Sequence, residues 1–369
     1  MCLKIWLPYT KFMKISNRQK SKKATRLIKV DKKNPAHSQI SEAAELVRNG
    51  ELVAFPTETV YGLGANGLNK SAIKKIFAAK NRPQDNPLIL HLAYKKDIYL
   101  YGRDISAKTK KLIRAFWPGP LTIVVKKNKN IPDIVTSGLD TIALRMPDNK
   151  IALALIKKAG VPIAAPSANV SGKPSPTSAM HVYSDMYGKI ELILDGGKTD
   201  VGLESTILDC SVDPPVLLRP GKITRKQIER LIGTIDIYLQ NNQYDYIKPK
   251  SPGLKYRHYA PDATLVLVDG EPEIMRNTVS LLIREYKEFT KKIGVLAFFT
   301  GHRYNLRKSD VLVNLGFHSR NVSRQLFATL RYFDEQGVDV IISESYPSGE
   351  HAIMNRLRKA ASEIIIAQQ

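Results

Sequence analysis

Cysteine is almost absent from this chain: only Cys2 and Cys210 occur among its 369 residues. The two share no motif, which excludes a disulfide framework and a cysteine-based zinc site. Proteins without structural disulfides are typical of reducing compartments, and we therefore predict an intracellular, cytoplasmic location.

Long apolar runs and familiar nucleotide-binding motifs are also missing. No stretch has the length of uninterrupted apolar residues that a membrane helix needs, so no membrane partner is expected. The sequence contains no P-loop, no His-Glu-x-x-His motif and no Gly-x-Ser-x-Gly elbow. Gly62 and Gly64 follow a predicted strand but lack the third glycine of a dinucleotide-binding fingerprint. Any nucleotide site must therefore use a less familiar arrangement.

Acidic residues are few beside the basic ones, with 34 Asp and Glu against 57 Lys and Arg and a net charge of +23. Residues 1–33 contribute +10 of this charge, because they hold eleven bases and the single acid Asp31. We interpret them as a disordered, solvated basic arm rather than an RNA-binding one, since no aromatic-basic repeat is present. The remaining +13 suits an enzyme whose ligands are phosphates or RNA.

The chain is too long for one ordinary domain, so two domains are expected. Residues 34–233 alternate between strand-like and helix-like apolar periodicity, which predicts an α/β domain. Some neighbouring strands have no helix between them, so the sheet is expected to be mixed. The predicted helices are 39–49, 71–80, 106–116, 149–159, 177–186 and 224–232, and the predicted strands are 52–55, 88–92, 121–125, 141–145, 161–165, 191–194, 205–209 and 216–219.

Residues 234–262 are rich in polar and tyrosine residues with little periodicity, and long linkers of this kind are often functional lids. Residues 263–369 then alternate again, which predicts a smaller α/β unit. Its predicted elements are strand 264–268, helix 273–287, strands 293–298 and 311–315, helix 321–335, strand 338–343 and helix 350–361.

The first motif with chemical potential is PTETVYGLG at residues 56–64, directly after the strand predicted at 52–55. Its threonines offer hydroxyl groups, and its glycines allow a ligand to approach the backbone closely. A tight connecting loop would explain the same residues, so spacing alone leaves both interpretations open.

Basic side chains follow the helix predicted at 71–80. Lys80 and Arg82 flank a single residue and could grip a triphosphate, with arginine as a two-pronged donor and lysine as a point charge. Basic residues are also common at helix C-termini, where they satisfy the helix dipole. His91, inside an apolar strand, would by itself more often be a core histidine than a ligand.

Three further segments place polar groups among small or apolar residues. The sequence AAPSAN at 164–169 puts a serine and an asparagine at a strand end, where they could bind a ligand or cap a helix. GLESTI at 202–207 and LRPG at 218–221 have the same character. Arg145 lies in an apolar run, and a buried arginine usually has an anionic partner.

In their order and spacing these motifs resemble the YrdC-like family of threonylcarbamoyl-AMP synthases. Lys80-x-Arg82 with Ser167-x-Asn169 is similar to the signature tetrad of that family, and the motifs around it match the family pattern as well. These further matches are PTETVYGLG, FWPGPLT at 116–122, ESTI at 204–207, the interdomain segment 251–261 and the final helix segment 352–360. The resemblance implies a YrdC-like twisted mixed-sheet domain with a basic concave surface, followed by a smaller Rossmann-like α/β domain.

The resemblance also implies an activity, that of a nucleotidyltransferase named L-threonylcarbamoyladenylate synthase. Such an enzyme uses L-threonine, bicarbonate and ATP with Mg²⁺, and releases pyrophosphate. No metal bound by protein ligands is expected. A downstream threonylcarbamoyl-transferase complex would pass the group to the adenosine beside the anticodon of ANN-decoding tRNAs, and contact with the tRNA is possible.

Residue by residue, the family pattern implies that Lys80 and Arg82 are catalytic and cradle the triphosphate. The implied ATP-binding residues are Lys80, Arg82, Asn86, Ser137, Ser167, Asn169, Ser175, Arg219 and Tyr259. The implied threonine-binding residues are Thr59, His91, Thr141, Ala165 and Ser205.

A carbamate and an adenylate are both labile in water, so we expect residues 234–262 to supply a closing lid. Two other interpretations remain. A similar domain occurs in hydrogenase-maturation carbamoyltransferases, but their cysteine-rich zinc modules are excluded by the two scattered cysteines. A non-catalytic RNA-binding module would use the basic surface, yet it would not need the Ser-x-Asn motif.

Overall fold

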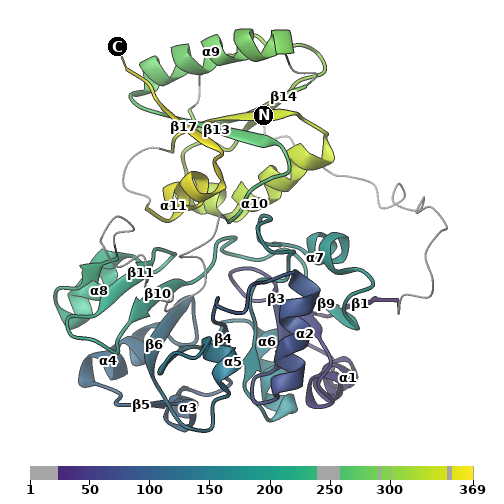
Figure 1. Cartoon of the computed structure of the whole chain (residues 1–369), viewed down its shortest axis with the longest axis vertical. Coiled ribbons are helices and arrows are strands. Elements are labelled where there is room, and N and C mark those ends of the chain that lie inside the picture. Colours follow the sequence, from purple (N-terminus) through teal and green to yellow (C-terminus); the bar gives the residue numbers. More distant parts are fainter. Residues whose placement is uncertain (1–23, 239–257, 290–291, 300, 347–350, 369) are drawn as a thin grey trace.

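The computed structural model describes residues 24–238, 258–289, 292–299, 301–346 and 351–368. These ranges form two α/β units, one above the other in Figure 1. The remaining residues, which include most of the predicted basic arm and linker, lie outside the described part of the chain.

The lower, N-terminal domain is built on one mixed sheet. Its strand order is β1-β9-β2-β3-β8-β4-β7-β6-β10-β11-β12, with β5 beside β6. Parallel pairs such as β4–β7 alternate with antiparallel pairs such as β6–β7, which confirms the predicted mixed sheet. The strands are β1 (Arg26–Lys29), β2 (Val53–Phe55), β3 (Gly62–Asn66), β4 (Ile89–His91), β5 (Gly102–Arg103), β6 (Leu121–Lys127), β7 (Thr141–Arg145), β8 (Ile163–Ala164), β9 (Leu192–Asp195), β10 (Thr206–Asp209), β11 (Val216–Arg219) and β12 (Asp236–Ile237).

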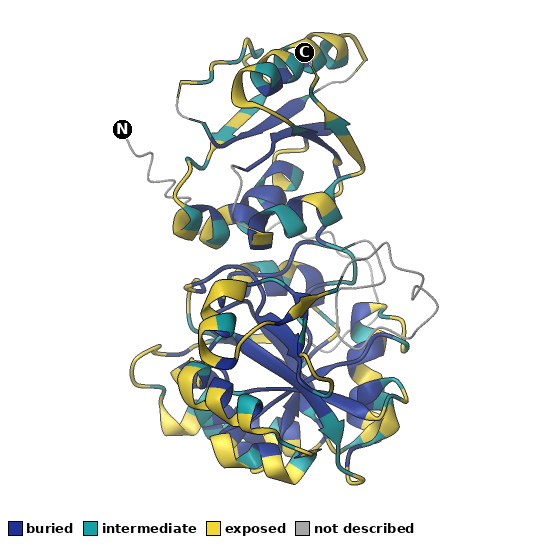
Figure 2. Cartoon of the chain, turned by 90° about the vertical axis from the view of Figure 1, so that its left-hand side faces the viewer, coloured by how far each residue is buried: buried dark blue, intermediate teal, exposed yellow. Residues whose placement is uncertain are grey.

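Helices pack on this sheet through their apolar faces, while their outer faces are exposed (Figure 2). The helices are α1 (His37–Arg48), α2 (Lys70–Lys80), α3 (Ile98–Tyr101), α4 (Ala107–Phe116), α5 (Asp133–Thr136), α6 (Lys150–Ala159), α7 (Ala179–Met186) and α8 (Arg225–Ile232). α2 shows why they begin and end where they do. The Asn69 side chain caps its N-terminus by accepting from two backbone N–H groups, and Asn81 ends it in the left-handed conformation at φ 51°.

Several segments differ from the sequence-based prediction, and three of them belong to the first sheet. The arm predicted to extend to residue 33 is wrong in its last part, because Arg26–Lys29 forms β1 and pairs in parallel with β9. The glycine-rich segment Gly62–Asn66 is a strand, not a loop, because it is held between β2 and β8. The first sheet also continues into the predicted linker, where β12 pairs with β11.

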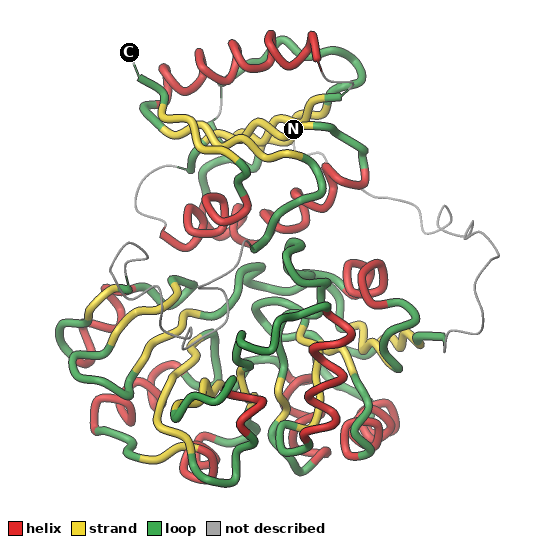
Figure 3. Tube along the Cα trace, viewed as in Figure 1, coloured by secondary structure: helices red, strands yellow, loops and turns green. Residues whose placement is uncertain are grey.

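The C-terminal domain has three layers (Figures 1 and 3). Its sheet is parallel throughout, in the order β15-β14-β16-β13-β17, as expected for a Rossmann-like unit. Helix α9 covers the outer face, and α10 and α11 lie on the face toward the N-terminal domain. The elements are β13 (Thr264–Asp269), α9 (Pro272–Phe289), β14 (Ile293–Ala297), β15 (Val311–Asn314), α10 (Ser319–Glu335), β16 (Val340–Glu344), α11 (His351–Ala360) and the unpredicted β17 (Glu363–Ile366).

The two domains are in tight contact. Val60 and Leu203 of the lower domain join the apolar cluster that contains Phe327 of α10. Arg331 of α10 makes a buried ion pair with Asp185 at 2.7 Å, and it also donates to the Pro174 carbonyl. This dense, partly charged interface fixes the C-terminal domain over the carboxyl ends of several strands below it.

No helix in the described part of the chain is long and apolar enough to cross a membrane.

Candidate active site

A pocket opens in the N-terminal domain below the C-terminal domain. It is lined by residues of the 56–64 motif, the ends of α2, β4, β7, β8 and β11, the loop before β10, and two residues that precede β13. The lining residues are Thr57, Thr59, Val60, Tyr61, Gly62, Arg82, Ile89, His91, Arg145, Ala165, Pro166, Ser167, Glu204, Ser205, Arg219, His258 and Tyr259.

The structure thus brings together most of the residues that the sequence singled out, from segments up to 200 positions apart. Eight of the predicted site residues line the pocket: Arg82, Ser167, Arg219 and Tyr259 of the ATP set, and Thr59, His91, Ala165 and Ser205 of the threonine set. Six do not line it: Lys80, Asn86, Ser137, Thr141, Asn169 and Ser175. Their ligand-binding roles stay predictions, and their contacts define what else they do.

Lys80 is fully buried at the end of α2 and faces backbone rather than the pocket. Its ammonium group donates to the carbonyls of Ser167 at 2.6 Å and Asn169 at 2.5 Å. Burial, reinforced by the positive charge of Arg82, holds the pKa of Lys80 well below its usual value. Lys80 therefore fixes the Ser167–Asn169 loop in place.

Arg82 does line the pocket, and its guanidinium group is oriented by the loop that follows. Its Nε and Nη2 donate to the Asn86 carbonyl at 3.2 and 3.1 Å, and Nη2 also reaches the Pro87 carbonyl. The side-chain Oδ1 of Asn86 is buried without a hydrogen-bond partner among the described residues. Ser137 donates to the Gln84 carbonyl in the same loop at 2.7 Å.

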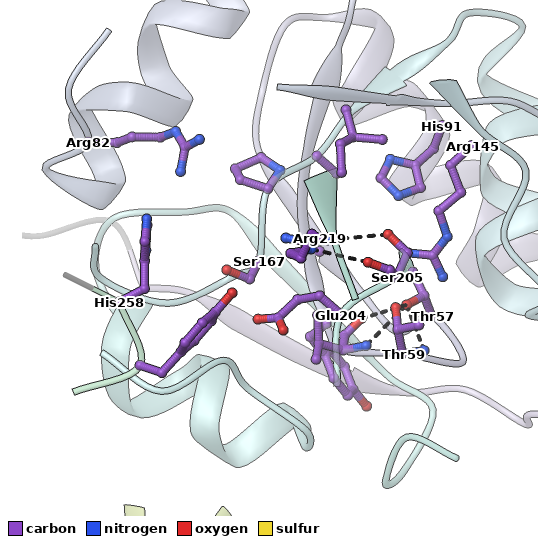
Figure 4. Close-up of a pocket in the computed structure, with 17 residues that line it drawn as sticks. Thr57, Thr59, Arg82, His91, Arg145, Ser167, Glu204, Ser205, Arg219 and His258 are labelled. Carbon is purple, nitrogen blue, oxygen red and sulfur yellow. Dashed lines mark hydrogen bonds between the residues drawn. The ribbon is translucent and has the colours of Figure 1, made fainter. Parts of the chain in front are cut away.

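Hydroxyl groups and two basic side chains gather at the opposite end (Figure 4). The hydroxyls of Thr57 and Thr59 are 2.8 Å apart. His91 on β4 is buried, and burial together with the positive charge of Arg145 lowers its pKa to about 3, so its imidazole is neutral. Its Nδ1 has no hydrogen-bond partner among the described residues. Nη2 of Arg145 lies 2.8 Å from the buried Glu58 carboxylate, which balances its charge.

Arg219 and Ser205 occupy the middle of the pocket. Arg219 Nε donates to the Ser205 carbonyl at 3.1 Å, and Nη2 donates to the Ser205 hydroxyl at 3.3 Å. The Ser205 hydroxyl is also 2.7 Å from that of Thr122 on β6. The end of β11 and the start of β10 are thereby locked together, which sets the position of a guanidinium group at the pocket centre.

The segment before β13 closes one side of the pocket. Tyr259 has a left-handed backbone conformation, at φ 66°, and its ring stacks on Phe327 of α10. Burial, and next the Glu204 carboxylate, raise the pKa of Tyr259, so its hydroxyl stays protonated. Burial and nearby cations, Arg82 first, lower the pKa of His258 to about 3. Both side chains present neutral polar groups to the pocket.

The remaining predicted residues lie behind the pocket wall. The Asn169 side chain donates to the carbonyls of Val170 and Lys173, and its Oδ1 has no partner among the described residues. Ser175 donates to Glu204 Oε1 at 2.5 Å. Thr141 is buried at the start of β7.

Nine residues that line the pocket were not among the predicted ligand residues, and those with polar or charged side chains are Thr57, Tyr61, Arg145, Glu204 and His258. Arg145 and Glu204 had been noticed only as polar residues within apolar segments. No group of three or more His, Cys, Asp or Glu side chains within the described ranges is placed to hold a metal ion.

Comparisons with known proteins find matches to both domains. The Sua5/YciO/YrdC family model, described as telomere recombination, matches residues 45–221, and the model described as threonylcarbamoyl-AMP synthase, C-terminal domain, matches residues 223–362. The threonylcarbamoyl-AMP synthase of Pyrococcus abyssi is 48% identical over 330 residues, which cover 89% of this chain and 95% of that protein.

Two further comparisons also match most of the chain to proteins of this kind. The threonylcarbamoyl-AMP synthase of Bacillus subtilis is also 48% identical, with 89% of this chain and 94% of the relative covered. The crystal structure of Pyrococcus abyssi Sua5 complexed with L-threonine superimposes with a TM-score of 0.85 at 46% identity, covering 93% of this chain and 100% of that one. The chain therefore belongs to the two-domain threonylcarbamoyl-AMP synthase family.

Proposed function

We propose that this chain is an L-threonylcarbamoyladenylate synthase, a nucleotidyltransferase that converts L-threonine, bicarbonate and ATP to threonylcarbamoyl-AMP and pyrophosphate. One observation carries the proposal: a single pocket has Arg82 at one end, Arg219 in the middle, and hydroxyl groups with the neutral His91 and Arg145 at the other end (Figure 4). An anionic nucleotide fits the first end and an amino acid fits the second. The family relationship makes threonine the expected amino acid.

At the amino-acid end, we assign the threonine carboxylate to the Arg145 guanidinium, because a planar fork matches a carboxylate. Thr59, Ser205 and the neutral His91 offer hydrogen bonds to the threonine hydroxyl and amine, and Ala165 offers an apolar wall for its methyl group. One methyl group in such a pocket gives only roughly 10–200-fold preference, so some use of serine is expected.

On the nucleotide side, Arg82 and Arg219 are the candidates for contact with the triphosphate, and Ser167 lies between these two arginines in Figure 4. Asn86, Ser137, Asn169 and Ser175 complete this side through the loops that they hold. Mg²⁺ would enter with ATP, held by phosphate oxygens and water, because the pocket carboxylate of Glu204 is already engaged by Ser175 and Arg356.

The reaction balances without a protein nucleophile. Condensation of the threonine amine with bicarbonate releases water and gives a carbamate. A carbamate oxygen then attacks the α-phosphorus of ATP, and the bond to pyrophosphate breaks. Arg82 and Arg219 stabilise charge on the phosphates, and positioning supplies much of the rate enhancement. Tyr259 and His258 exclude water from this labile chemistry.

The adenylate would then serve a downstream threonylcarbamoyl-transferase complex that modifies the adenosine beside the anticodon of ANN-decoding tRNAs. The net positive charge of the chain is favourable for contact with tRNA.

The direct test is pyrophosphate release by the purified chain with ATP, Mg²⁺, threonine and bicarbonate. Omission of threonine or bicarbonate should each abolish release. Arg82→Ala should abolish it by loss of phosphate contact, and Lys80→Ala by loss of the Ser167–Asn169 loop geometry. Turnover without threonine, or RNA binding with no turnover at all, would refute the proposal.

A further inference from the structure

The C-terminal domain inserts one charged side chain into the wall of the pocket. Arg356 of α11 is 0% exposed and is the largest of the fully buried side chains in the described part of the chain. Burying a guanidinium group is unfavourable unless charge and hydrogen-bond partners compensate it. Its compensating partners therefore indicate what the side chain does.

Those partners lie mainly in the other domain. Arg356 Nε donates to Glu204 Oε2 at 3.1 Å, Nη1 donates to the Pro220 carbonyl, and Nη2 reaches the Glu204 carbonyl at 3.4 Å. Pro220 directly follows Arg219, and Glu204 directly precedes Ser205. One guanidinium group thus holds both loops that carry the central pocket residues.

Glu204 links Arg356 to Ser175, a residue predicted to bind ATP. Its other oxygen, Oε1, accepts the hydrogen bond from Ser175 at 2.5 Å. Burial alone would raise the pKa of Glu204, but Arg356 and Arg219 outweigh burial, so the pKa is lowered and the carboxylate stays ionised. Glu204 is the only carboxylate among the described residues that line the pocket. Its charge would repel a triphosphate if nothing neutralised it.

Arg356 also contacts the segment that closes the pocket. Its guanidinium carbon lies 5.8 Å from the centre of the Tyr259 ring, and the same ring stacks on Phe327 of α10. Domain docking therefore neutralises Glu204 and places Tyr259 at the same time.

We propose that Arg356 is a positioning residue of the nucleotide site, which neutralises and fixes Glu204 and thereby makes the pocket complete only when the C-terminal domain is docked. This inference rests on the proposed function in one respect, that the pocket binds ATP. It explains why the described residues of the accessory domain do not line the pocket and yet shape the site.

The test compares three variants with the wild-type chain. Arg356→Met removes the ion pair of Glu204, which keeps its hydrogen bond from Ser175 and the attraction of Arg219. Glu204→Gln/Arg356→Met removes both charges. Arg358→Met is the matched control on the same helix, because Arg358 is 57% exposed and pairs with Asp269 away from the pocket. Calorimetry measures the Kd of a non-hydrolysable ATP analogue and of L-threonine, and thermal denaturation verifies folding.

We expect Arg356→Met to weaken binding of the ATP analogue by about tenfold or more, because a buried carboxylate without its ion pair then faces the triphosphate. Threonine binding should change by less than about twofold, within the scatter of near-neutral contacts. The double variant should regain at least half of the lost binding free energy, and Arg358→Met should bind as the wild type does. This pattern cannot come from general loss of structure, which would weaken threonine binding as well as ATP binding.

Unchanged ATP affinity in Arg356→Met would overturn the inference. Equal losses of ATP and threonine affinity with no recovery in the double variant would overturn it as well, as would an Arg356→Met chain that fails to fold while the double variant also fails. Binding needs no turnover, so a wild-type chain that binds ATP but forms no adenylate would refute the proposed function alone.

Discussion

Replacement of Gly202 by alanine adds a single Cβ atom at the contact between the two domains, and so tests how closely they pack. Gly202 has φ +81°, a conformation that other residues rarely adopt. A Cβ atom there would lie 2.4 Å from the Ser323 carbonyl oxygen and 2.4 Å from Arg324 Cα, both in the backbone of α10. Backbone atoms of a helix cannot rotate aside, so either α10 moves away from the lower domain or the loop before Glu204 is displaced.

The expected cost follows from two contributions. A left-handed alanine costs about 1–2 kcal/mol, and forcing an extra methyl group into a packed interface costs about 1–3 kcal/mol. Gly202→Ala should therefore lower the free energy of unfolding by roughly 2–5 kcal/mol in urea denaturation. Because Gly202 precedes Glu204, the variant should also bind ATP more weakly.

Gly160→Ala is the matched control. Gly160 has a similar φ of +69°, but nothing lies within 4 Å of the position of its Cβ. It should lose only the backbone contribution of about 1–2 kcal/mol. If the two variants lose the same free energy of unfolding, the contact between Gly202 and α10 does not contribute to stability. The protein would then not use the described interface.

Three more predictions concern single side chains. Arg331→Met should lower the free energy of unfolding by about 3–5 kcal/mol in urea denaturation, because it removes the buried ion pair of Asp185. Asp185→Asn/Arg331→Met should recover part of that free energy. If it recovers none, the loss does not come from the unpaired charge. Thr59→Val should raise the Kd for threonine about tenfold in calorimetry and leave the Kd for the ATP analogue unchanged. Equal effects on both ligands would contradict the division of the pocket into two ends. His91 and His258 have pKa values lowered to about 3 in the folded chain, so the unfolded chain binds more protons and the free energy of unfolding should fall as the pH drops from about 6.5 toward 3. Proton NMR of the wild-type chain should show both rings neutral at pH 5. A titration of either ring near pH 6.5 would contradict their burial.

The sequence predicted the alternation of helices and strands well where periodicity was strong. The helices on both domains begin and end close to the predicted residues, because their apolar faces repeat with the helical period. β3 was missed because GLGAN lacks the β-branched and aromatic residues typical of strands, and pairing with β2 and β8 holds it extended. β1 was missed because its two apolar residues lie in a basic run, whose charge suggested a solvated arm.

For the site, the sequence singled out residues that the fold brings together, but it could not show how their side chains are oriented. Lys80 is expected from the sequence to cradle a triphosphate, and that role stays a prediction. The structure adds that its buried amino group donates to two carbonyls, a contact that no local motif indicates. The importance of Glu204 depends on Arg356, which lies 152 positions later in the chain. Such a contact between two domains has no signature in the local sequence.

The central claim is that this pocket joins a carbamoylated threonine to AMP. The most direct measurement is mass spectrometry of the nucleotide product after incubation with ATP, Mg²⁺, threonine and ¹³C-labelled bicarbonate, with pyrophosphate measured in the same sample. The account predicts threonylcarbamoyl-AMP that carries one ¹³C atom, in an amount equal to the pyrophosphate released. Pyrophosphate released with unlabelled AMP, or ADP and phosphate in its place, would contradict the account.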